Sequence, residues 1–151
     1  MQGNKGEWSE SYAALRIIGD RKIFVADRSG AMNPNEWMNV LALMRRETRE
    51  RLVSYRYDEN DVDVVIAVNE DPVYRLPASE FVSLADRLLT EINRNKSSSF
   101  VVTDERESAL RTVQVHSLKA KSDSKSDVTL SVLDPRSGVT RSEIGFSIKS
   151  E

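Results

Sequence analysis

The sequence contains no cysteine, only one histidine and no long apolar run. Without cysteine there is no disulfide framework and no thiolate metal site. No stretch is long and apolar enough to span a membrane, and Met1–Lys5 is not followed by the apolar core of a signal peptide. These absences exclude integral membrane proteins and disulfide-rich secreted proteins. We therefore expect a cytoplasmic protein that does not associate with a membrane.

An excess of one charge sign is also absent, since 22 Lys and Arg stand against 24 Asp and Glu, a formal net charge of −2. This near balance argues against a strongly basic nucleic-acid-binding protein. It does not exclude a nuclease, because an acidic active site offsets a basic surface that faces DNA. The length of 151 residues predicts a single domain over residues 1–151, or the N-terminal part of a larger one.

Two alternating segments near the end of the sequence predict a β-hairpin. The segment 126–133 alternates apolar and polar residues, and so does the segment 143–150. Pro135 and Gly138 lie between them, as expected for a tight turn. If the arms end at Leu133 and Glu143, antiparallel register places Asp127 opposite Lys149 on the polar face.

An acid opposite a lysine suits phosphodiester hydrolysis. The Asp127 carboxylate can hold a hard cation, for which Mg²⁺ is the best candidate. The Lys149 ammonium can stabilise developing negative charge or position the attacking water. The alternative is a structural cross-strand ion pair on the surface, and alternation alone does not separate the two interpretations.

Asp127, followed after the turn by Gly145–Ser150, resembles the PD-(D/E)xK nuclease motif. More narrowly, the sequence resembles the HpaII-type restriction endonucleases in three ordered pieces: Lys5–Glu10, then Lys119–Ser122 with Lys125–Asp127, then Asp134–Gly138 leading into Gly145–Ser150. The resemblance implies cleavage of double-stranded DNA with Mg²⁺ at CCGG.

The resemblance also implies that Asp127, Ser147 and Lys149 occupy the catalytic positions. Ser147 departs from the motif, which has Asp or Glu there, so the second metal carboxylate is unassigned. Glu143, Glu151 or Glu10 could supply it, and Glu10 on the first helix could equally be a surface acid near the positive end of the helix dipole.

Periodicity predicts the remaining elements. Apolar residues at helical spacing predict helices over 6–19 and 77–95, with a shorter helix over 104–113. Strands are expected over 22–26 and 115–121. Residues 36–51 fit either a helix or a strand. We favour a hairpin that turns at Glu47–Glu50 and opens an antiparallel meander over 37–68.

Two groups of basic residues are candidates for phosphate contacts. Lys119, Lys121 and Lys125 flank the proposed metal site, which favours a DNA-binding role. The arginines Arg45, Arg46, Arg49 and Arg51 alternate with acids, so a solvated face is the favoured interpretation there. His116, as a lone histidine, is expected to be structural or exposed on the surface.

These elements predict an α+β fold, with an N-terminal helix, antiparallel β-meanders and flanking helices. The resemblance implies a restriction-endonuclease-like core that is C-terminally incomplete, with a nuclease hairpin region at about 115–151 and a meander of 115–121, 126–133 and 143–149. Homodimerisation or a missing C-terminal segment would then complete the sheet. The expected function is a type II restriction endonuclease, and the alternative is a catalytically inactive DNA-binding or assembly fragment of one.

Overall fold

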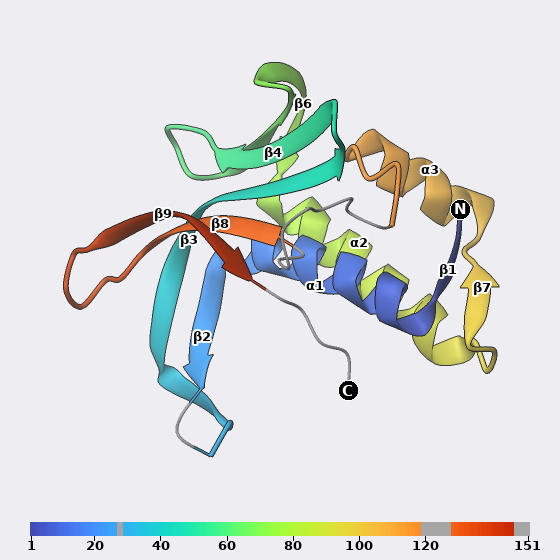
Figure 1. Cartoon of the computed structure of the whole chain (residues 1–151), viewed down its shortest axis with the longest axis horizontal. Coiled ribbons are helices and arrows are strands. Elements are labelled where there is room, and N and C mark those ends of the chain that lie inside the picture. The colour runs from blue at the N-terminus through green and yellow to red at the C-terminus, as the bar shows by residue number, and fades with distance from the viewer. Residues whose placement is uncertain (27–28, 119–127, 147–151) are drawn as a thin grey trace.

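A computed structural model describes residues 1–26, 29–118 and 128–146, and Figure 1 shows the chain as an α+β protein, as predicted. None of the helices in these ranges is long and apolar enough to cross a membrane. In chain order the elements are β1 (Gln2–Asn4), α1 (Lys5–Asp20), β2 (Lys22–Ala26), β3 (Met32–Thr48), β4 (Arg51–Tyr57), β5 (Asp63–Val68), β6 (Asp71–Pro77), α2 (Ala78–Arg94), β7 (Ser99–Val101), α3 (Asp104–Thr112), β8 (Val128–Leu133) and β9 (Thr140–Phe146).

The long strand β3 organises the main sheet, whose order is β6-β5-β4-β3-β8-β9 with every pair antiparallel. One edge of β3 pairs first with β2 and then with β4, while its other edge pairs with β8. The β2–β3 arm and the β8–β9 hairpin extend away from the helices in different directions (Figure 1). The predicted hairpin over 36–51 is confirmed, and the helical alternative is wrong.

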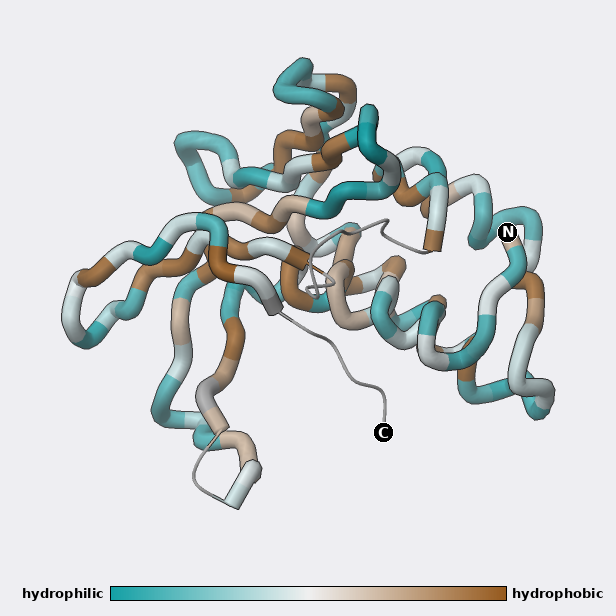
Figure 2. Tube along the Cα trace, viewed as in Figure 1, coloured by the Kyte–Doolittle hydropathy of each residue, from teal (hydrophilic) through white to brown (hydrophobic). Residues whose placement is uncertain are grey.

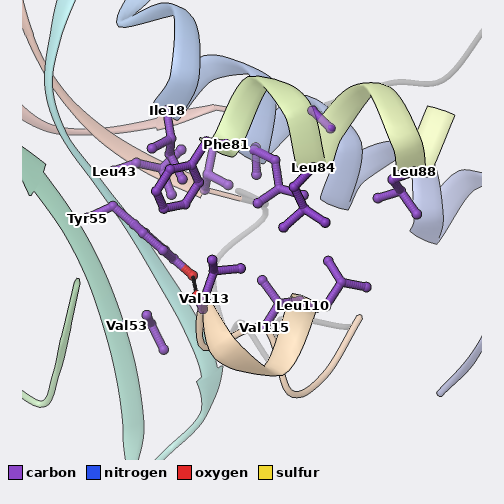
Figure 3. Close-up of a cluster of buried hydrophobic side chains, with 14 of the residues drawn as sticks. Ile18, Leu43, Val53, Tyr55, Phe81, Leu84, Leu88, Leu110, Val113 and Val115 are labelled. Atoms are coloured by element: carbon purple, nitrogen blue, oxygen red, sulfur yellow. Dashed lines mark hydrogen bonds between the residues drawn. The ribbon is translucent and has the colours of Figure 1, made fainter. Parts of the chain in front are cut away.

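Helices α1 and α2 pack against each other and supply much of the apolar core. The expected stripe of α2 is confirmed, because Phe81, Leu84, Leu88 and Ile92 are all buried. Figure 3 shows Phe81, Leu84 and Leu88 facing residues of β3, β4 and the segment after α3. Figure 2 shows that polar residues prevail at the β3–β4 and β4–β5 turns, away from this core. The helices therefore fix the part of the sheet from which the two hairpins extend.

Specific capping contacts define both ends of α1. At the N-terminus Asn4 and Glu7 form a reciprocal capping box, which satisfies backbone N–H groups that the helix leaves unpaired. At the C-terminus the helix continues to Asp20, and Arg21 takes the left-handed conformation with φ 61°. The helix therefore ends one residue beyond the predicted range of 6–19. A Cβ on Gly19 would lie 2.9 Å from the backbone N of Val82, so its lack of a side chain permits close packing on α2.

The strand predicted over 115–121 is wrong over the described residues 115–118, which form no strand. The strand that precedes β8 in the sheet is β3, which is distant in sequence. Residues 113–118 instead pass over the core, where Val113, Val115 and Leu118 are buried. Tyr55 of β4 is also part of this core, and its hydroxyl donates to the Val113 carbonyl at 2.7 Å.

Candidate functional site

Most of the predicted site residues lie outside the described part of the chain. These are the catalytic positions Asp127, Ser147 and Lys149 and the phosphate-contact candidates Lys119, Lys121 and Lys125. The described residues include the two proposed carboxylate ligands, Glu10 and Glu143. They also include the β8–β9 hairpin, which adjoins the predicted catalytic positions in sequence.

The β8–β9 hairpin exists, but its register differs from the predicted one. Leu133 pairs with Thr140 rather than with Glu143, and Leu130 pairs with Ile144. The second arm starts earlier than expected because Asp134–Val139 closes the turn, with Gly138 at φ 71°. The register from which Asp127 was placed opposite Lys149 is consequently wrong, although both residues themselves lie outside the described ranges.

Glu143 occupies an irregular position of β9. The pairing shifts between Leu130 and Val132, and Glu143 opposite this shift has a positive φ of 56°. A β-bulge of this kind re-aims side chains relative to the regular pleat. The Glu143 side chain is exposed. Its carboxylate is thus available at the surface of the hairpin that leads to residues 147–151.

Glu10 lies on α1 and is partly buried. It interacts with other groups of the protein. Glu10 and Glu143 thus come from different elements, α1 and β9. Among the residues that the structure describes, no three His, Cys, Asp or Glu side chains are placed to hold a metal ion. The assignment of either glutamate as a metal ligand therefore stays a prediction.

The most deeply buried charge described in the structure is on Glu47 of β3, whose side chain is 1% exposed. Its Oε2 accepts a hydrogen bond from Arg45 Nη1 at 2.8 Å and from the backbone N–H groups of His116 and Ser117 at 2.9 and 2.6 Å. Its Oε1 accepts one from Arg51 Nε at 2.8 Å. We call this group of Arg45, Glu47 and Arg51 the Glu47 network.

Burial by itself raises the pKa of the Glu47 carboxyl. The hydrogen bonds from Arg51 and Ser117 and the nearby charge of Arg45 outweigh that effect, so the pKa lies below its ordinary value. Glu47 is therefore ionised and fixed. Because it holds the backbone of residues 116–117, it also anchors the chain immediately before Lys119.

The arginine group thus divides into two halves. Arg46 and Arg49 are exposed at the β3–β4 turn, in agreement with the solvated face that we expected. For Arg45 and Arg51 that interpretation is wrong, because Arg45 is 7% exposed and Arg51 bonds both Glu47 and Gln114. The only sequence signal for this network is the shared face of Arg45 and Glu47.

His116 is exposed, and its Nε2 lies 3.3 Å from the Arg111 carbonyl oxygen. Its backbone N–H is more informative, since it bonds Glu47. The structure thus gives the histidine ring a local contact, consistent with the expected structural or surface role.

The family model described as HpaII restriction endonuclease matches residues 4–151. The chain belongs to this family. The type II restriction enzyme HpaII of Haemophilus parainfluenzae is 32% identical over 151 residues, which is 100% of this chain and 41% of that enzyme. The chain thus spans less than half the length of this curated relative. No solved structure matches the chain. The resemblance carried by the three ordered motif pieces is therefore confirmed at the level of the family.

Proposed function

We propose that the chain contributes to a cytoplasmic type II restriction endonuclease that hydrolyses double-stranded DNA with Mg²⁺, at CCGG. The observation that carries the proposal is the family match over residues 4–151, together with the identity to an enzyme named as a type II restriction enzyme. The low cysteine and histidine content points to oxygen ligands, which suit a hard cation such as Mg²⁺.

In this proposal Asp127 is the first metal ligand, and Glu143 or Glu10 supplies the second carboxylate. A bound cation would supply positive charge to offset the charge that develops on the phosphate. Lys149 orients the attacking water, and Ser147 occupies the motif position at which PD-(D/E)xK nucleases have Asp or Glu. The exposure of Glu143 on β9 supports its inclusion, because a ligand must reach a metal that also contacts DNA.

Lys119, Lys121 and Lys125 bind phosphates beside this site. The Glu47 network supports this role, since it holds residues 116–117 and so fixes where the lysine-rich segment leaves the core. Either a second copy of the chain or a C-terminal segment completes the sheet and supplies further contacts with the bases.

The test is cleavage of a plasmid that contains several CCGG sites, by this chain in Mg²⁺. We expect discrete fragments, which disappear in Asp127→Asn, in Lys149→Ala and when a chelator removes the metal. Asp123→Asn is the matched control, because it removes an acid from the same segment without touching the motif. Cleavage that persists in Asp127→Asn or Lys149→Ala would remove the proposed catalytic assignment.

The alternative is a catalytically inactive DNA-binding or assembly module. This alternative predicts that the wild-type chain and the Asp127→Asn variant are both folded and bind DNA equally well. Neither of them would cleave the DNA. Circular dichroism would establish that both chains are folded. Cleavage by the wild-type chain would exclude this alternative.

A further inference from the structure

A small hollow lies at the junction of the β2–β3 arm and the β8–β9 hairpin. Asn35, Trp37, Pro135 and Arg136 line it, and its volume is about 250 Å³. This is below the range of about 300–1,000 Å³ that is usual for sites that bind drug-sized molecules. The size suits a single small ring system rather than an extended ligand.

Strand pairing forms the walls of the hollow. Asn39 of β3 pairs with Leu133, so the turn after β8 runs beside residues 35–37 of β3. Asn35 and Trp37 are two residues apart on that strand and therefore point to the same face. Arg136 is held beside β3 by an ion pair with Glu36 at 3.2 Å.

Aromatic and basic side chains of the β2–β3 arm lie at and next to the hollow. Trp37 is only partly buried, and the Lys22 ammonium lies 4.8 Å from the centroid of its ring. Phe24, which pairs with Trp37 across the arm, is 43% exposed. Aromatic rings next to cations provide a stacking surface for a base together with attraction for the adjoining phosphates.

The hollow itself is lined almost entirely by apolar atoms, which suits the faces of a base ring. A guanidinium and a carboxamide are the side-chain groups that most often form paired hydrogen bonds with purine edges. Arg136 and Asn35, two of the lining residues, carry one of each. The ion pairs that Arg136 makes with Glu36 and Asp134 are solvent-exposed, with the Arg136 side chain 58% exposed. Exposed ion pairs contribute little free energy, so Arg136 can exchange them for a base at small cost.

We propose that this hollow, formed by Asn35, Trp37, Pro135 and Arg136, binds one unstacked nucleobase of a DNA strand. The proposal deepens the proposed function and rests on it for the choice of DNA as ligand. Inside a duplex a base presents no free face to Trp37, so it must leave the stack to enter. The chain should therefore prefer unpaired bases to the same bases in a perfect duplex.

Tryptophan fluorescence of the 151-residue chain provides the test, because the chain has two tryptophans and Trp8 is fully buried. The probes are a short single-stranded oligodeoxynucleotide of mixed sequence and an abasic strand of the same length. We expect the base-containing strand to quench the fluorescence and the abasic strand to leave it nearly unchanged. Binding is followed in parallel by anisotropy of a label on the DNA, which does not depend on Trp37.

Trp37→Ala should weaken binding of the base-containing strand about 5- to 150-fold, as expected when one base loses its aromatic platform. Trp37→Phe, which keeps a ring, should retain most of the affinity. Tyr74→Ala is the matched control, because Tyr74 is an aromatic residue of β6 that is 45% exposed. Circular dichroism of each variant verifies that it is folded.

Equal binding of the abasic and the base-containing strands would overturn the inference, and so would the absence of binding to either. The same conclusion would follow if Trp37→Ala behaved like Tyr74→Ala. None of these measurements requires cleavage. A chain that discriminates between the strands but does not cleave CCGG sites would support base binding in the hollow and contradict the catalytic proposal. A chain that cleaves CCGG sites but does not discriminate between the strands would support the catalytic proposal and contradict base binding in the hollow.

Discussion

A carboxylate buried as deeply as that of Glu47 is stable only because four donors surround it. Two are arginine side chains and two are backbone N–H groups of residues 116–117. Removing one member of a buried ion pair leaves the other charge without compensation, which costs far more than losing an exposed pair. The network therefore joins the β3–β4 hairpin to the segment that leads toward the predicted lysines.

We predict that Glu47→Gln lowers the free energy of unfolding by about 3–5 kcal/mol, although glutamine has nearly the same shape. Glutamine leaves Arg45 and Arg51 without a carboxylate and replaces one acceptor oxygen with a donor. Urea denaturation measures the change. Glu50→Gln, an exposed acid of the same hairpin, should change stability by less than about 0.5 kcal/mol. Equal effects of the two substitutions would contradict the network.

The lowered pKa of Glu47 predicts a pH dependence of stability. Its folded-state pKa lies below the ordinary glutamate value of about 4.3, so the unfolded chain takes up the proton first as the pH falls. The contribution of Glu47 is complete above that ordinary value and is lost as the pH falls through the folded-state pKa. Denaturation at a series of acidic pH values should show the difference between wild type and Glu47→Gln shrinking in that window. A difference that stays constant there would refute the assignment.

For single residues, the sequence predicts which face of a strand a side chain lies on, but not which residues pack against that face. Alternation places Arg45 and Glu47 on one face of a strand, and the mixture of charges favours exposure to water. One of the groups that surround the Glu47 carboxylate is the backbone N–H of Ser117, which lies 70 residues away in sequence. Local pattern carries no information about such a contact. Trp37 shows the same limit, because Pro135 and Arg136 form the other wall of its hollow.

At the scale of elements, the contact between α1 and α2 leaves no room for a side chain at Gly19. An added Cβ at Gly19 would lie 2.5 Å from Val82 Cγ2 and 2.9 Å from its backbone N. Alanine gains up to about 1 kcal/mol of helix propensity over glycine. Overpacking costs about 1–3 kcal/mol, and a clash with backbone falls at the upper end of that range. The cost of the clash therefore exceeds the gain in helix propensity.

We therefore predict that Gly19→Ala destabilises the protein by up to about 2 kcal/mol. Adding Val82→Ala should recover only part of the loss, because the contact with the Val82 backbone persists. Asn93→Ala on the exposed side of α2 is the control and should not destabilise. Thermal unfolding of the four proteins measures these effects. A Gly19→Ala variant more stable than wild type would show that the helices separate without cost.

Elements with a clear periodicity of apolar residues were predictable from the sequence. Features that depend on how strands pair were not. The apolar spacing of Phe81, Leu84 and Leu88 predicts α2 correctly. Strand β6 escaped prediction because its turn uses Asn69 and Glu70 at positive φ, where a glycine would have been the usual signal. The β8–β9 register was wrong because the turn closes over Asp134–Val139, so the second arm begins at Thr140 and not at Glu143.

For the whole molecule, the α+β class followed from the order of helical and alternating segments, but the sheet order did not. The prediction joined β8 to the segment before it in sequence, as most neighbouring strands are joined. In the structure β3 takes that place, because it is long enough to pair with β2 and β4 on one edge and β8 on the other. Family membership was predictable from short ordered motifs, since these do not depend on the sheet order.

A net charge of −2 means that any attraction of this chain for DNA arises locally. The logarithm of the binding constant falls linearly with the logarithm of salt concentration, with a slope of about −0.9 for each phosphate that is neutralised in duplex DNA. If Lys119, Lys121 and Lys125 each neutralise one phosphate, replacing all three with Gln should make the slope shallower by about 3 units. Filter binding or anisotropy at several salt concentrations, with a chelator present to prevent cleavage, measures the slope.

The matched control replaces Lys5, Arg94 and Lys96 with Gln, which removes the same charge near the start of α1 and the end of α2. The start of α1 lies beside the segment that follows α2, because the Lys5 backbone N–H bonds the Ser98 carbonyl. In Figure 1 the start of α1 and the end of α2 lie at the end of the helices opposite to the β8–β9 hairpin. Net charge falls equally in both variants, so a general electrostatic effect would change both slopes alike. A change confined to the Lys119, Lys121 and Lys125 variant would locate the DNA contact beside the predicted catalytic hairpin, and equal slopes would refute it.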